Sequence, residues 1–203
     1  MKKIMLAMAA CLTIGLAMGQ TRFDACLMGG FNMSQIDGDG AGKYNHPGFR
    51  VGVGSSFTLS GDTDSPWRMV VELAYTQKGS YINATDRNLS VNYVEVPVMI
   101  SYNMIDNRLR FAAGVAPAIQ VGASVTTNGV DEPQSAANFT RMDWLPLTAT
   151  ARYRFATHTC IELRYQNSML SITKENGSGT YRIFRSNTGA FSRLLTIGLA
   201  YQF

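Results

Sequence analysis

The feature of this sequence that most constrains its fold is an alternation of apolar and polar residues with a period of two. It is clearest in the last segment, "LLTIGLAYQF", where Leu195, Ile197, Leu199, Tyr201 and Phe203 are separated by small or polar residues. Alternate side chains of a β-strand point to opposite faces, so this pattern predicts a strand with one apolar face. The same pattern recurs at residues 23–31, 49–59, 67–79, 91–102, 109–121, 145–155 and 160–165.

Eight strands of this length suit a single small barrel, and 203 residues suit one domain. The connections between strands are unequal, and long polar ones alternate with short ones. In an up-and-down barrel, alternate connections lie at the same rim, as in outer-membrane barrels. We therefore predict an all-β fold, an eight-stranded antiparallel up-and-down transmembrane β-barrel with short periplasmic turns and long extracellular loops. The predicted loops span residues 37–47, 80–88, 124–142 and 171–188.

The first 19 residues have the layout of a secretory signal peptide. Lys2 and Lys3 precede an apolar run, and Ala17 and Gly19 are small residues at the positions a signal peptidase requires. The run is shorter than the roughly 20 residues that a transmembrane helix needs. We predict a signal peptide over 1–19 and a barrel domain over 20–203. Processing as a lipoprotein at Cys11 is the alternative, and it would leave an apolar stub.

The polar face of the strands indicates which side lines the barrel interior. It combines charges of both signs with Gly, Ala, Ser and Thr, which suits a narrow lumen filled by ion pairs. Aromatic residues gather where strands meet the short turns, as in the aromatic girdle of a membrane barrel. We predict a filled lumen that is not a pore. The predicted lumen charges are Arg50, Arg68, Glu72, Lys78, Glu95, Arg110, Arg152, Arg154, Glu162 and Arg164.

A reversed polarity would give a different protein. A secreted, soluble, lipocalin-like barrel has an apolar interior that binds a small apolar ligand, and we keep it as the alternative. The order of the connections favours the membrane barrel. Charged residues make up 16% of the chain, and its cations are scattered along the strands, so we expect no nucleic acid as partner.

We predict no catalytic site, cofactor or metal. His46 and His158 have no Ser and acid that the pattern places beside them. Residues 37–44 imitate calcium and phosphate loops but lack the ligands that complete either one. Cys26 and Cys160 lie on strands separated by one other strand, roughly 9–10 Å apart. A disulfide needs Cα atoms within about 7 Å, so we expect two free thiols in the lumen.

Several segments together resemble the PorT-like outer-membrane β-barrel proteins of Gram-negative bacteria. The more specific pieces are "VELAYTQKGS" at 71–80 and "YVEVPVMISY" at 93–102, which carry E-L-x-Y-x-Q-K-G and Y-x-E-x-P. Other pieces are "GGFNMSQIDGD", "GFRVGVG", "RFAAGVAPAIQVG", "IELRYQNSM" and "LTIGLAYQF". The resemblance implies a small barrel in the cell outer membrane and brings no catalytic residues.

The same resemblance bears on assembly and partners. The final strand, with Leu199, Tyr201 and Phe203 on one face, fits the signal that the barrel assembly machinery recognises in such proteins. The expected surroundings are outer-membrane lipid and lipopolysaccharide. We expect a non-enzymatic protein with a structural or interaction role, in which the extracellular loops contact a protein partner.

Overall fold

The computed structural model describes residues 23–37, 44–59, 65–82, 85–104, 108–133, 140–172 and 191–203. The predicted signal peptide, residues 1–19, lies outside them. No helix in these ranges is long and apolar enough to cross a membrane. The strands are β1 Phe23–Asp37, β2 His46–Thr58, β3 Trp67–Ile82, β4 Arg87–Glu95, β5 Val98–Met104, β6 Leu109–Val115, β7 Ala118–Thr127, β8 Val130–Asp131, β9 Met142–Asp143, β10 Pro146–Arg154, β11 Thr159–Ser168 and β12 Phe191–Gln202.

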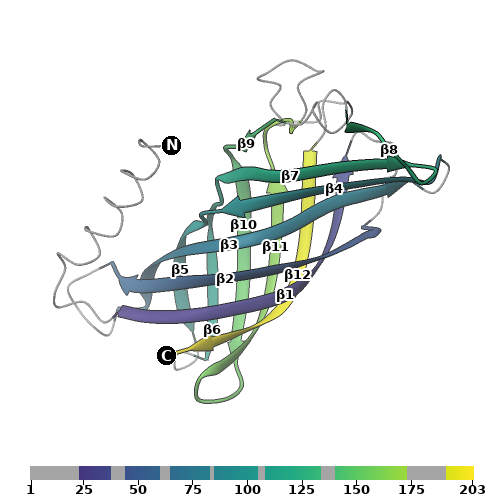
Figure 1. The fold of residues 1–203 in the computed structure, drawn as a ribbon. Helices are drawn as coiled ribbons and strands as arrows, with labels where there is room; N and C mark the ends of the chain where they lie inside the picture. Colours follow the sequence, from purple (N-terminus) through teal and green to yellow (C-terminus); the bar gives the residue numbers. More distant parts are fainter. Residues whose placement is uncertain are drawn as a thin grey trace.

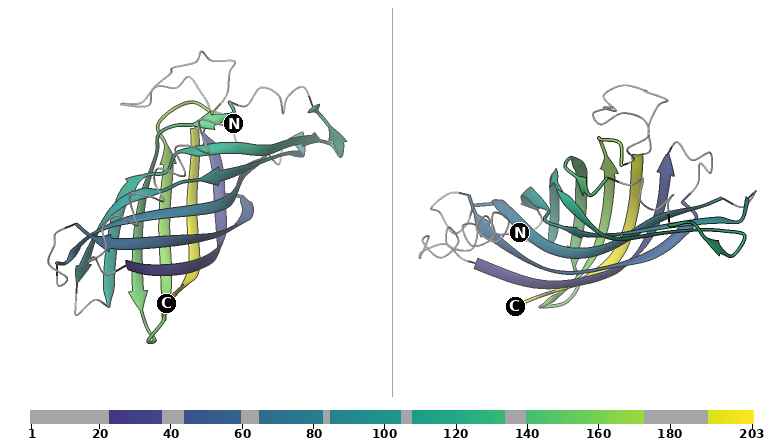
Figure 2. Two further views of the ribbon diagram at one scale, coloured as in Figure 1. Left: turned by 60° about the vertical axis from the view of Figure 1, so that its left-hand side comes forward. Right: turned by 45° about the horizontal axis from the view of Figure 1, so that its top comes forward.

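Eight of these strands close into a ring, in the order β1, β12, β11, β10, β6, β5, β3, β2 and back to β1. Every pairing is antiparallel. The strands β2 and β3 cross β10 and β11 steeply on the opposite wall (Figures 1 and 2), as tilted strands of a barrel must. The predicted eight-stranded up-and-down barrel is confirmed.

Proline residues interrupt two of the strands that the alternation predicts as continuous, at Pro97 and Pro117. Proline has no N–H to donate to a sheet, so each ladder is broken for two residues. The carbonyl oxygens of Pro97, Pro117 and Pro146 nevertheless accept hydrogen bonds of 2.9 Å from neighbouring strands. The segments 91–102 and 109–121 are therefore each two strands, β4 with β5 and β6 with β7. The predicted segment 145–155 stays whole as β10, which begins at Pro146.

Beyond the ring, part of the sheet continues past the loop rim. This extension is formed by the far end of β3 with β4, β7 and β8, and Figure 2 shows it reaching away from the barrel. The predicted loops 80–88 and 124–142 are wrong in part, because β3 runs to Ile82, β4 begins at Arg87 and β7 runs to Thr127. Asn128 and Gly129 have φ of 51° and 77°, which suits a tight hairpin turn into β8.

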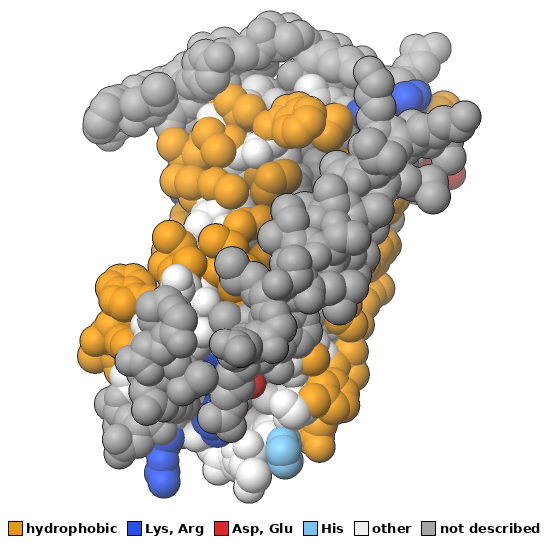
Figure 3. Space-filling model, turned by 90° about the vertical axis from the view of Figure 1, so that its left-hand side faces the viewer, with side chains coloured by type: hydrophobic (Ala, Val, Ile, Leu, Met, Phe, Trp, Pro, Cys, Tyr) orange, Lys and Arg blue, Asp and Glu red, His pale blue; other side chains and the backbone are white. Residues whose placement is uncertain are grey.

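The polarity of the ring is that of a membrane protein. Its outer face exposes Leu27, Phe31, Val53, Leu163 and Ile197, each at half or more of its surface. Figure 3 shows hydrophobic side chains over much of the described surface on one side. The inner face carries the charged residues. The alternative of a soluble barrel with an apolar interior is therefore wrong.

Candidate functional site: the lumen and the extracellular sheet

The centre of the lumen holds five charged side chains that alternation turns inward from four strands. Glu72 on β3 accepts bonds from Arg50 on β2 at 2.8 Å, and from Arg152 on β10 and Arg164 on β11 at 2.6 Å each. Glu162, also on β11, lies 2.5 Å from Arg152 and 3.0 Å from Arg164. We call these five residues the central cluster. It joins strands that do not neighbour each other in the ring.

Burial makes the central cluster interdependent. All five side chains expose 5% or less of their surface. A buried charge is tolerated only when paired and hydrogen-bonded, because water no longer stabilises it. Three arginines and two glutamates leave the cluster with a net charge of +1. Each carboxylate is thus shared between guanidinium groups, and removing one leaves several cations without compensation.

A lumen-facing glycine provides room for this arrangement. A Cβ atom on Gly54 would lie 3.0 Å from the Cγ atom of Glu72, and 2.9 and 3.1 Å from Met28 and Cys26. Those are shorter than ordinary contacts between side chains in a packed interior. The absence of a side chain at Gly54 therefore leaves space for the Glu72 side chain beside β2.

A second layer lies between the central cluster and the loop rim. The ammonium group of Lys78 is 2.6 Å from Glu95 and 5.1 Å from the ring centre of Tyr93. The side-chain amide of Gln166 donates a hydrogen bond of 3.2 Å to the same carboxylate of Glu95. Beside it, Asp143 accepts a bond of 2.8 Å from Ser168. Lys78 and Glu95 are both buried, so this layer also occupies the lumen.

A third layer lies towards the short turns, and its cations are paired differently. Arg68 forms an ion pair of 2.7 Å with Asp24. The predicted lumen charges Arg110 and Arg154 instead donate to amide oxygens, those of Asn103 and Gln202, at 2.7 Å each. The ten predicted charges therefore form three layers and no single network.

These three layers fill the lumen. A cavity of about 10 Å³ lies beside Val70, Met99 and Arg152, which is room for about one water molecule. An eight-stranded barrel leaves space for little more than its own side chains. The lumen is therefore closed, and the protein is not a pore.

The two cysteines lie inside the ring near the third layer. Cys26 and Cys160 are buried with Met28 and Ala200, and both are free thiols. Strand β12 separates them, since Cys160 pairs with Ala200 and Cys26 pairs with Gln202. This agrees with the expectation from the spacing of the strands.

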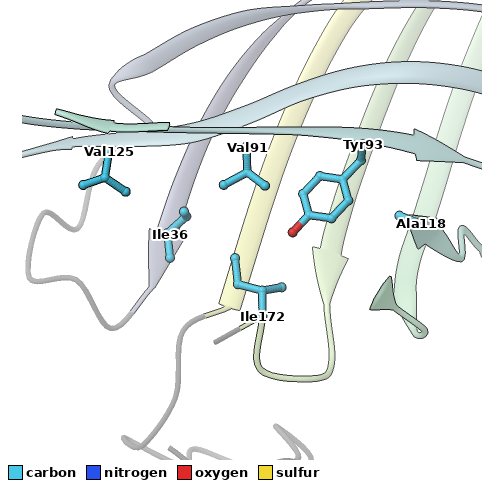
Figure 4. Close-up of a cluster of buried hydrophobic side chains, with 6 residues drawn as sticks. All are labelled: Ile36, Val91, Tyr93, Ala118, Val125 and Ile172. Carbon is cyan, nitrogen blue, oxygen red and sulfur yellow. The ribbon is translucent and has the colours of Figure 1, made fainter. Parts of the chain in front are cut away.

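The extension has the reverse polarity of the ring. Along β4, inward-facing Glu95 gives way to Tyr93 and Val91, while outward-facing Val94 gives way to Asn92. An apolar cluster therefore lies beneath the sheet (Figure 4), formed by Ile36, Val91, Tyr93, Ala118, Val125 and Ile172. An apolar inner face and a polar outer face are what water on the outside requires. The change of polarity places the extension above the membrane.

Several predicted features concern the outer surface or the loops. Leu199 and Tyr201 lie on the outer face of β12, and Phe203 follows the strand and is also exposed. The ring centres of Tyr201 and Phe203 are 5.2 Å apart. Residues 38–43, within the segment that imitates calcium and phosphate loops, lie outside the described residues. Asp37, which precedes them, forms an ion pair of 2.8 Å with Arg193. The part of the chain that the structure describes contains no group of His, Cys, Asp and Glu suited to a metal.

Sequence reasoning missed two uncharged hydrogen-bond partners at the turn rim, Asn103 and Gln202, and one acidic residue near the loop rim, Asp143. Asn103 and Gln202 alternate correctly but are ordinary polar residues, and no signal distinguishes them. Asp143 lies between the predicted loop 124–142 and the predicted strand 145–155, so neither prediction included it. The "NG" at 128–129 between β-prone residues was a usable hairpin signal, and it marks the β7–β8 turn.

Comparison with known proteins agrees with this architecture. Residues 15–190 match the family model described as outer membrane protein beta-barrel domain. Ail, the attachment invasion locus protein of Yersinia pestis, crystallised with the heparin analogue sucrose octasulfate, is 14% identical with a TM-score of 0.52. The match covers 90% of this chain and 99% of that one. Neisserial surface protein A is 15% identical over 89% of this chain and 97% of its own, with a TM-score of 0.46. No curated protein sequence matches the chain.

Proposed function

This chain belongs to the outer membrane protein beta-barrel domain family, and from that membership we propose that its closed barrel holds the extension at the cell surface as a contact surface for a macromolecular partner. One observation carries the proposal. The sheet of β3, β4, β7 and β8 continues past the lumen layers with an apolar core of its own, centred on Val91 and Tyr93. A contact surface needs such a core, because it must keep its shape outside the membrane.

The polar outer face of the extension is the proposed surface of contact. Asn88 on β4 and Ser124 on β7 are exposed there. The ion pair of Arg87 with Glu132, at 3.8 Å, lies at the same end. In this proposal the lumen layers act as a brace, and we assign no catalytic role to any residue. Lipopolysaccharide surrounds the base of the extension, and the barrel assembly machinery inserts the protein through Leu199, Tyr201 and Phe203.

The resemblance to PorT-like proteins gives this proposal a finer family assignment. The two specific pieces of sequence meet inside the barrel, where Lys78 of the first contacts Tyr93 and Glu95 of the second. Glu72 of the first piece stands in the central cluster, and Pro97 of the second marks the break between β4 and β5. The PorT-like assignment rests on these two pieces of sequence, whose side chains contact each other in the lumen.

Photo-crosslinking in intact cells tests the contact surface. A photoreactive amino acid replaces Asn88 or Ser124, and the matched control replaces Leu163, which is half exposed on the lipid-facing side of β11. We expect crosslinks to the same macromolecule from both extension positions and none of that species from Leu163. The absence of crosslinks at both extension positions would contradict the proposal. Planar bilayers should show no steady conductance.

A further inference from the structure

Five of the seven predicted cations of the lumen pair with a carboxylate. Arg50, Arg68, Lys78, Arg152 and Arg164 each lie within 4 Å of a carboxylate. Two cations of the third layer have only a neutral acceptor. They are Arg110 on β6 and Arg154 on β10, which donate to Asn103 and Gln202 respectively. The third layer therefore has two positive charges that no carboxylate of the described residues neutralises.

These two arginines lie close together and near other cations. Arg110 stands directly opposite Arg152 across the β6–β10 pair, and the backbone N–H of Arg154 donates to the carbonyl of Arg108 at 2.8 Å. Arg110 is within electrostatic range of Arg152, Arg68 and Arg154, which repel it, and of Asp24, which attracts it. The Asp24 carboxylate is already bound to Arg68 at 2.7 Å. Repulsion therefore exceeds attraction at this site.

Arg110 also has unused donors. It exposes 6% of its surface, and its Nε–H donates to Asn103, which leaves the four protons of its two Nη groups. No described residue accepts from them. A buried guanidinium with a single neutral acceptor is costly, because its charge has lost water without gaining a counterion. Arg154 is only partly buried and Arg108 is exposed, so the group reaches the periplasmic mouth of the lumen.

We propose that Arg110 and Arg154 bind a small oxyanion, a carboxylate or a phosphate, that enters from the periplasm. The planar fork of a guanidinium matches two oxygens of either group, and two such forks on adjacent strands hold one anion between them. An anion here supplies the negative charge that the third layer lacks. The anion is either free in the periplasm or the headgroup of a phospholipid in the inner leaflet.

Thermal unfolding of the purified barrel in a non-ionic detergent tests this site. Sodium phosphate and sodium acetate are compared with sodium chloride at equal ionic strength. A ligand that binds only the folded state raises the unfolding temperature as its concentration rises. We expect phosphate or acetate to raise it more than chloride does. Isothermal titration should show affinity at least tenfold weaker in Arg110→Gln and in Arg154→Gln.

The matched control is Arg87→Gln, which removes an exposed arginine at the opposite rim. It should keep the full response to the anion. Without oxyanion, Arg110→Gln should unfold at the same temperature as the wild type or higher, since repulsion from Arg152 and Arg68 is relieved. If Arg110→Gln does not fold, Arg154→Gln gives the same test from a partly buried position.

Two results would overturn the proposal. One is a wild type that responds equally to all three anions, and the other is a double variant, Arg110→Gln with Arg154→Gln, that keeps the full response. Nanodiscs distinguish the sources. A stabilisation by phosphatidylglycerol that is lost in the double variant assigns the site to a headgroup, whereas a phosphate response in neutral lipid assigns it to a free anion.

Discussion

Replacing Glu72 by Gln is the most informative perturbation of this barrel. The substitution keeps the size of the side chain and one acceptor oxygen, but it removes the negative charge that Arg50, Arg152 and Arg164 share at 2.6–2.8 Å. The net charge of the central cluster then rises from +1 to +2. Because Glu72 exposes none of its side chain, water cannot take over the missing charge. We expect the free energy of unfolding to fall by about 3–5 kcal/mol, the cost of breaking a buried pair.

Denaturant unfolding of the purified protein, refolded into lipid or detergent, measures this change. Glu132→Gln is the matched control, because Glu132 pairs with Arg87 at 3.8 Å on the exposed part of the extension. Exposed pairs of that kind contribute about 0–1 kcal/mol. A second variant, Arg164→Gln with Glu72→Gln, should lose less than the two single variants together, since both act on one contact. A loss below about 1 kcal/mol for Glu72→Gln would refute the reasoning.

Three other predictions concern the lumen and assembly. Gly54→Val should lower the free energy of unfolding by about 1–3 kcal/mol through overpacking, and an unchanged unfolding midpoint would contradict this. Cys26 and Cys160 should each take one alkyl group after denaturation without reductant, and an intact mass with no adduct would reveal a disulfide. Deletion of Phe203 should reduce the amount of protein in the outer membrane more than its folding in detergent. Equal membrane levels of deletion and wild type would count against a role in assembly.

The sequence by itself determined the ring and its polarity. Alternation with a period of two is a local property, and it assigns every strand residue to one of two faces without any tertiary information. The hairpin between β10 and β11 shows how far this reaches. Its short turn at 155–158 makes Arg152 the direct neighbour of Glu162, so that ion pair was within reach of sequence reasoning. The predicted loops 80–88 and 124–142 included the far ends of the strands in the extension. A strand with a polar outer face in water has a sequence pattern close to that of a loop.

Only the tertiary structure decided which charges pair across the lumen. Glu72 and Arg152 are 80 residues apart, and two strands of the ring separate β3 from β10. Whether their side chains meet depends on the shear of the barrel, the tilt of its strands and the height of each residue along its strand. None of these is written in a local pattern. The same holds for Arg110 and Arg154, because only the tertiary structure shows that no carboxylate of the described residues pairs with them.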